Sequence, residues 1–185
     1  MAEFGAKYPC FKSSATGVTA GVVLGKLVSA NLTVNLASGE LYADDTLAEQ
    51  LSEFASGSIA METDDLTDDN AEKVYGCTVS EGLVTYKQGD TPPLGKLAYY
   101  KVLMRNGTRM YKGYYYPKVR AAIGNDNAQT RGSSITFQTT QTTFTVFADT
   151  DGTWRQTKEF DTEAAAKSWV QTQCSISVSN SSNPV

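Results

Sequence analysis

Carboxylates are the side chains whose spacing in this sequence comes closest to a chemical site. Asp64, Asp65, Asp68 and Asp69 crowd into one short segment, and oxygen-rich groups of this kind bind hard cations such as calcium. Residues 149–152 (DTDG) also resemble a calcium loop, but the glycine comes too early and the closing glutamate is misplaced. Helix-terminus charge and turn chemistry account for both groups, so we expect no metal site.

Catalytic side chains are scarce in this chain. It contains no histidine, which excludes histidine-based acid–base catalysis, Ser–His triads and histidine-ligated metals. Cys10, Cys77 and Cys174 are widely spaced and form no CxxC pair, so they are predicted to be reduced structural thiols. The sequence carries no phosphate loop, dinucleotide fingerprint or nucleophile with a base beside it. We therefore expect neither an enzyme nor a cofactor.

A tyrosine-rich basic hairpin is the strongest local signal. The dipeptide 106–107 (NG) lies between the runs LAYYKVLMR and TRMYKGYYY and is typical of a type I′ turn. Pairing outward from this turn sets Met104 opposite Arg109, Val102 opposite Tyr111, Tyr100 opposite Gly113 and Ala98 opposite Tyr115. This largely apolar face is predicted to be the core face, with Tyr100 covering the bare glycine.

The opposite face of the hairpin pairs Lys101 with Lys112 and Tyr99 with Tyr114. Directly opposed lysines are destabilising unless an acidic group lies over them, so this face is predicted to meet a partner. Interleaved tyrosines and lysines also resemble a platform for single-stranded nucleic acid. The chain is acidic, however, with a net charge of −4 and an isoelectric point near 4.9, and core or interface packing explains the tyrosines better.

Charge is segregated along the chain. Residues 40–73 hold eleven acids and one lysine, whereas residues 96–120 hold seven basic residues and no acid. Two interpretations remain open: the segments compensate each other within one subunit, or they meet between subunits and steer self-assembly. On the second interpretation the candidate interface residues are Tyr99, Lys101, Arg105, Lys112 and Tyr114 on the basic side, and Asp64, Asp65, Asp68 and Asp69 on the acidic side.

The elements that position these residues fit one domain, because the chain has 185 residues. Twenty-two threonines and ten tyrosines favour strands, and short helices are predicted over 64–76 and 161–172. We expect a mainly β, sandwich or barrel-like fold with two short helices. Its predicted parts are an N-terminal arm (1–17), a β domain (18–172) and a polar C-terminal tail (173–185). Strands are predicted within 18–36, within 40–43 after a turn at 38–39, within 47–63 with a break near Gly57, and within 78–87, 97–116 and 133–148, with a short one around Trp154.

Three stretches of the chain are similar, in order and spacing, to the major tail proteins (tail tube proteins) of long-tailed non-contractile phages of Gram-positive bacteria. They are GELYADDTLAEQLSEFASGSIAMETDDLTDDNAEKVYG (Gly39–Gly76), YYKVLMRNGTRMYKGYYYPKV (Tyr99–Val119) and GSSITFQTTQTTFTVFADTDGTWRQTKEFDTEAAAKSWV (Gly132–Val170). The ends of the chain, before residue 18 and after Val170, do not match strongly.

The resemblance implies a structural virion protein. Subunits of this family close into rings of six, and the rings stack into a hollow tail tube through which DNA is ejected without specific binding. The implied partners are further copies of the chain and other tail proteins (tape measure, tail terminator and tip), with assembly in the host cytoplasm. Neither a secretory signal nor a membrane span is expected, since apolar runs such as Val22–Leu24 are only a few residues long and a bilayer needs about 20 residues. Two alternatives remain open: the tube protein of a contractile tail or injection apparatus, and a single-strand nucleic-acid-binding module.

Overall fold

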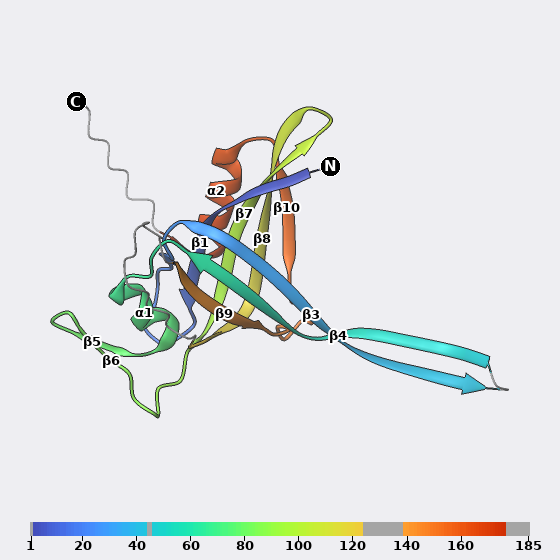
Figure 1. Ribbon diagram of the computed structural model, residues 1–185, viewed down its shortest axis with the longest axis horizontal. Coiled ribbons are helices and arrows are strands. Elements are labelled where there is room, and N and C mark those ends of the chain that lie inside the picture. Colours follow the sequence, from blue (N-terminus) through green and yellow to red (C-terminus); the bar gives the residue numbers. More distant parts are fainter. Residues whose placement is uncertain (1, 44–45, 124–138, 177–185) are drawn as a thin grey trace, which may run out of the picture.

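The computed structural model describes residues 2–43, 46–123 and 139–176 of the chain, with backbone only for Ala2, 42–43 and 46–48. Two helices accompany a set of antiparallel strands (Figure 1). In chain order the elements are β1 (Ala2–Ser13), β2 (Val22–Val23), β3 (Leu27–Ala43), β4 (Thr46–Thr63), α1 (Asp68–Tyr75), β5 (Thr78–Ser80), β6 (Leu83–Thr85), β7 (Leu94–Arg105), β8 (Thr108–Ala122), β9 (Thr140–Val146), β10 (Gln156–Phe160) and α2 (Glu163–Gln173).

Most strands belong to one antiparallel sheet with the order β2-β1-β7-β8-β9-β4-β3, and β10 also pairs with β8. Strand β8 changes neighbours along its length, because residues 111–115 pair with β10 and residues 119–122 pair with β9. Strand β3 comes back into contact with β1, so the sheet curls around its own interior. The predicted fold class, mainly β and sandwich-like with two helices, is confirmed.

The β7–β8 hairpin is buried on both of its faces. Its register matches the sequence prediction, and the turn residues Asn106 and Gly107 have φ values of 49° and 78°. One face, with Tyr99 and Tyr114, lies in the interior of the curled sheet, and the other packs beneath α2. The prediction of a single core face is therefore incomplete.

The residue that covers Gly113 differs from the prediction. A Cβ placed on this glycine would lie 2.6 Å from two ring carbons of Trp169, which comes from α2. Tyr100 pairs with Gly113 in the register, but its ring packs edge-on against the Tyr111 ring, with the two centroids 6.3 Å apart. Gly113 thus leaves the space into which the helix sets its tryptophan.

Both predicted helices are present, and each begins a few residues after the start of its predicted range. Helix α1 has Thr67 as its N-cap residue and ends at Gly76 in the left-handed region, with φ at 72°. Helix α2 begins after Thr162, whose hydroxyl accepts a hydrogen bond from the Ala165 N–H. Gly76 suits this position because a glycine carries no Cβ to oppose a positive φ.

Several predicted boundaries are corrected by the structure. The expected arm, residues 1–17, contains β1, which lies within the sheet and buries Cys10 and Phe11 completely. The expected strand over 78–87 is a small β5–β6 hairpin turning at residues 81–82. Cys174 of the expected tail is buried against the sheet, and residues 124–138 and 177–185 lie outside the described chain.

Candidate assembly surfaces

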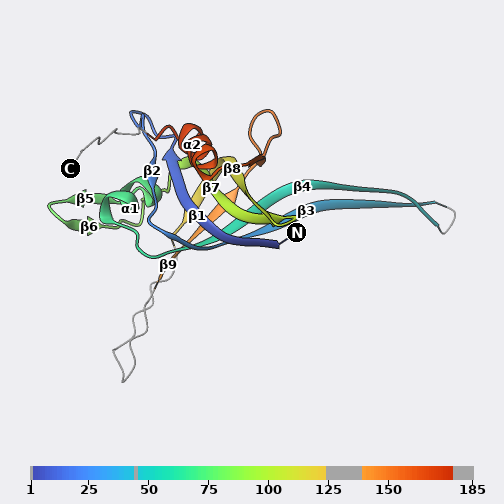
Figure 2. The same ribbon diagram turned by 90° about the horizontal axis from the view of Figure 1, so that it is seen from above.

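The β3–β4 hairpin reaches well beyond the body of the molecule (Figures 1 and 2). At its base the Phe54 ring stacks on Trp154, with centroids 4.3 Å apart and ring planes 2° apart. Beyond this stack the described side chains, at 36–41 and 49–53, are all exposed. We call residues 36–43 and 46–53 the arm, and each of its strands extends roughly 20 Å at the rise of a β-strand.

The arm carries apolar side chains where a solvated hairpin would be polar. Leu41 and Leu51 are 57% and 62% exposed. Because Leu41 pairs with Glu49 and Gly39 pairs with Leu51, both leucines lie on one face together with Glu49 and Glu53. We call these four side chains the arm face. On the other side of the arm, the Gln50 amide donates a hydrogen bond to Glu40.

The lysine pair of the β7–β8 hairpin already has acidic neighbours in its own chain. Lys101 lies 3.5 Å from Glu3 of β1, and Lys112 lies 3.8 Å from Glu159 of β10. Glu159 also bridges Arg105 at 2.9 Å. These carboxylates supply the acidic groups that the sequence analysis sought in another subunit, so the opposed lysines no longer require an external partner.

The tyrosines of the hairpin are core residues. The rings of Tyr99 and Tyr114 stack with their centroids 5.3 Å apart, and the two residues are only 2% and 8% exposed. The prediction that they lie at a subunit interface is therefore corrected. Burial raises the pKa of Tyr114 to about 12, so its hydroxyl stays protonated at neutral pH. Tyr100, Tyr111, Tyr115 and Tyr116 are buried as well. The six rings therefore offer no free surface on which a base could stack, which removes the feature that favoured nucleic-acid binding.

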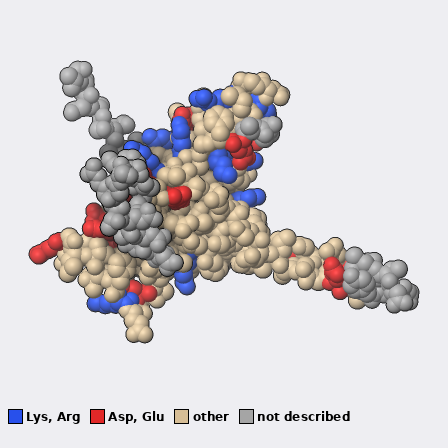
Figure 3. All heavy atoms as spheres, in the orientation of Figure 1, with Lys and Arg blue, Asp and Glu red and all other residues tan. Residues whose placement is uncertain are grey.

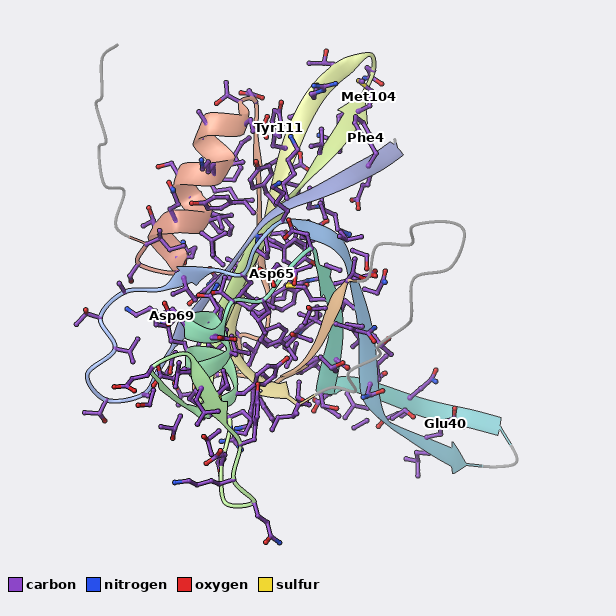
Figure 4. All side chains as sticks on the ribbon, turned by 60° about the vertical axis from the view of Figure 1, so that its left-hand side comes forward. Phe4, Glu40, Asp65, Asp69, Met104 and Tyr111 are labelled. Atoms are coloured by element: carbon purple, nitrogen blue, oxygen red, sulfur yellow. The ribbon has the colours of Figure 1, made fainter. Side chains whose placement is uncertain are left out.

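The four aspartates lie around the start of α1, away from the turn of the basic hairpin, although α1 itself contacts β8. Figure 4 places Asp65 and Asp69 near this helix and Met104 well above them, near the hairpin turn. Asp64 accepts a hydrogen bond from the Lys26 N–H at 2.6 Å, and Asp68 and Asp69 occupy the first turn of α1. Among the described residues, no cluster of histidine, cysteine or acidic side chains has a metal-binding arrangement.

All three cysteines are free and buried. Burial raises the pKa of the Cys174 thiol to about 12 and raises that of Cys10 as well. Cys174 donates a weak hydrogen bond to the Cys10 carbonyl at 3.4 Å. The thiols therefore pack as small apolar groups and are protonated at neutral pH.

A second lysine pair was missed by the sequence analysis. Lys12 of β1 lies directly opposite Lys96 of β7, just beyond the carboxyl end of α2, where Lys12 donates a hydrogen bond to Ser175 at 3.0 Å. Within the described part of the chain, no carboxylate forms a salt bridge with either lysine. The pairing joins residues far apart in sequence, and Lys12 lies in the predicted N-terminal arm (1–17), so no local pattern indicated that the two lysines are opposed.

The sequence matches no protein-family model, and no curated protein matches it significantly. In the described part of the chain, no helix is long and apolar enough to cross a lipid bilayer. The arm and the second lysine pair are therefore the features from which a function can be inferred.

Proposed function

We propose that this chain is a structural protein that assembles with copies of itself, and that the assembly is the tail tube of a long-tailed non-contractile phage. The observation that carries the proposal is the arm, a two-stranded extension with exposed leucines, of which Leu41 and Leu51 share one face. Such a hairpin is marginally stable alone in water. Contact with another subunit would bury Leu41 and Leu51 and hold the arm in place.

The sheet supports repeated association as well. Strand β3 ends the sheet, and β10 pairs with β8 alone. Exposed strand edges favour pairing with further chains unless they are covered, and closure of strands into a continuous barrel removes them. A head-to-tail contact that closes on itself produces a ring. The similarity of three sequence stretches to tail tube proteins favours stacked rings, which we propose to be hexameric.

The charge of the chain suits a conduit for DNA. Each subunit carries a net charge of −4, and a wall rich in carboxylates repels phosphate, whereas each lysine contact to phosphate would retain the DNA. The proposed partners are therefore further copies of the chain, the tape measure, terminator and tip proteins of the tail, and DNA that passes without specific binding.

Electron microscopy of the purified protein tests this proposal. We expect hollow tubes or rings of uniform diameter at high protein concentration. Tubes that disappear in high salt would indicate that charge contacts contribute to the interfaces. A monodisperse monomer at every protein and salt concentration, even after purified tail tips are added as nuclei, would contradict the proposal.

A further inference from the structure

The second lysine pair is an unresolved electrostatic cost in the isolated subunit. Lys12 and Lys96 face each other across β1 and β7, and like charges directly opposite in a sheet are destabilising. The same arrangement at Lys101 and Lys112 is relieved by Glu3 and Glu159. Among the described residues, no carboxylate neutralises Lys12 or Lys96 in this way, so a neutralising group would have to come from outside them.

The surroundings of this pair would accept a partly apolar partner. Both lysines are half-buried, and they lie on the sheet face that α2 covers, beyond the last turn of the helix. Val23, opposite Cys10 on the same face, and Ile176 are partly exposed and belong to the cluster beneath α2. Lysine stems add further apolar surface. The site thus combines two positive charges with aliphatic carbon.

The arm face has the complementary chemistry. Its two exposed leucines lie beside Glu49 and Glu53, and the chain contains no lysine or arginine between Lys26 and Lys73. In Figure 3 the charged atoms visible on the arm are acidic, whereas basic atoms gather around α2 and the β7–β8 hairpin. The arm leads away from α2 in both ribbon views (Figures 1 and 2), so it is directed toward another copy and not toward its own lysine pair.

We propose that the arm face of one subunit docks on Lys12 and Lys96 of a neighbouring copy, with Glu49 and Glu53 neutralising the lysines and the leucines packing on Val23 and Ile176. This proposal rests on the proposed function, because it names the partner surface of the arm. The contact is heterologous, joining different surfaces of two identical chains, and therefore propagates from subunit to subunit.

A charge-swap experiment tests the docking. The arm variant Glu49→Lys/Glu53→Lys and the pair variant Lys12→Glu/Lys96→Glu should each raise the critical concentration for polymerisation about tenfold or more, since close interfacial charge pairs contribute at least that much. Combining all four substitutions should restore polymerisation to within about threefold of wild type on the same grounds. The control Lys73→Glu/Lys87→Glu has the same change in charge as the pair variant, and because neither lysine lies on a strand of the sheet it should polymerise normally.

Each outcome decides the proposal. Thermal melting should show folded monomers for all variants, because two opposed glutamates repel about as strongly as two opposed lysines. Carbodiimide coupling of wild-type tubes should join Lys12 or Lys96 to Glu49 or Glu53 of another chain. The docking would be overturned if the folded two-substitution variants polymerise like wild type, or if the variant with all four substitutions does not regain polymerisation. Coupling of these lysines to the terminal carboxylate of their own chain would overturn it as well. If wild-type protein polymerises in the same experiment, only the docking fails and the proposed function stands.

Discussion

The two long hairpins of this protein have opposite relations to the rest of the chain. The β7–β8 hairpin is covered on one face by the interior of the curled sheet and on the other by α2, and its lysines have carboxylates within the same subunit. The β3–β4 hairpin leaves the body at Phe54 and carries the exposed Leu41 and Leu51 beyond that point. The first hairpin is packed on both faces within one chain, whereas the second leaves its described outer side chains exposed and, under our proposal, is covered by another subunit.

This difference separates stability from assembly. Substitutions in the β7–β8 hairpin should change the free energy of unfolding of the monomer, because its contacts form within one chain. Substitutions in the outer arm should leave that free energy nearly unchanged, because its described side chains are exposed to solvent. The expected loss of monomer stability is largest for Gly113, smaller for the Lys101–Lys112 pair and smallest for Glu163.

Gly113→Ala is expected to lower the free energy of unfolding by about 1–3 kcal/mol, the usual cost of overpacking a core. The added Cβ would lie 2.6 Å from the Trp169 ring, and the ring is held between the sheet and α2. Urea denaturation measures the loss. Gly39→Ala is the matched control, since nothing lies within 4 Å of its added Cβ; equal stability of the two variants would contradict the packing described for Gly113.

Reversing Lys101 and Lys112 to glutamate should lower the free energy of unfolding by about 1 kcal/mol or less, as expected for partly exposed ion pairs. The substitutions place like charges beside Glu3 and Glu159. Polymerisation at fixed concentration should change little, because these lysines are satisfied within their own chain. Sedimentation separates the two effects, and complete loss of polymer from a stable monomer would show that this face is an interface after all.

The smallest expected effect is a dependence of stability on pH at Glu163. Hydrogen bonds from Lys7 and Tyr100 hold the pKa of this carboxyl below its ordinary value of 4.5. A lowered folded-state pKa contributes stability above the unfolded-state pKa, and this contribution is lost as the pH falls through the folded-state pKa. Glu163→Gln should therefore be less stable than wild type at neutral pH, and the difference should shrink below pH 4.5. Denaturation curves at pH 7 and pH 3 measure it; an unchanged difference would refute the assignment.

The sequence predicted the parts of the fold that depend on neighbouring residues. The type I′ turn at Asn106-Gly107, the register outward from it and the presence of both helices follow from local chemistry. The expected turn at 38–39 and the expected break near Gly57 are wrong, because β3 and β4 run through these positions. The position of β1 could not be predicted in this way, because its pairing with β7 joins residues 82 (Ser13 and Gly95) to 102 (Ala2 and Met104) positions apart and its mixed sequence carries no clear alternation. The contact of Trp169 with Gly113 depends on α2 packing back against the sheet, which no local signal specifies.

The candidate sites were harder to predict. The acidic segment contains both the arm and the start of α1, which the fold carries to different places (Figure 4), so its charge could not be treated as one surface. The opposed lysines were correctly identified as a problem in need of an acid, but the acids come from β1 and β10. The same reasoning applied to Lys12 and Lys96 needed the sheet order, which only the structure provides.

The most direct test of the central claim compares Leu41→Ser/Leu51→Ser with Leu83→Ser by analytical ultracentrifugation under conditions in which wild-type protein polymerises. Leu83 is 68% exposed on the β5–β6 hairpin and serves as the control for exposed leucines in general. The Leu41→Ser/Leu51→Ser variant should remain monomeric with an unchanged melting temperature, and Leu83→Ser should polymerise like wild type. Normal polymerisation of the Leu41→Ser/Leu51→Ser variant would contradict the account, because the arm would then not be the element that joins the subunits.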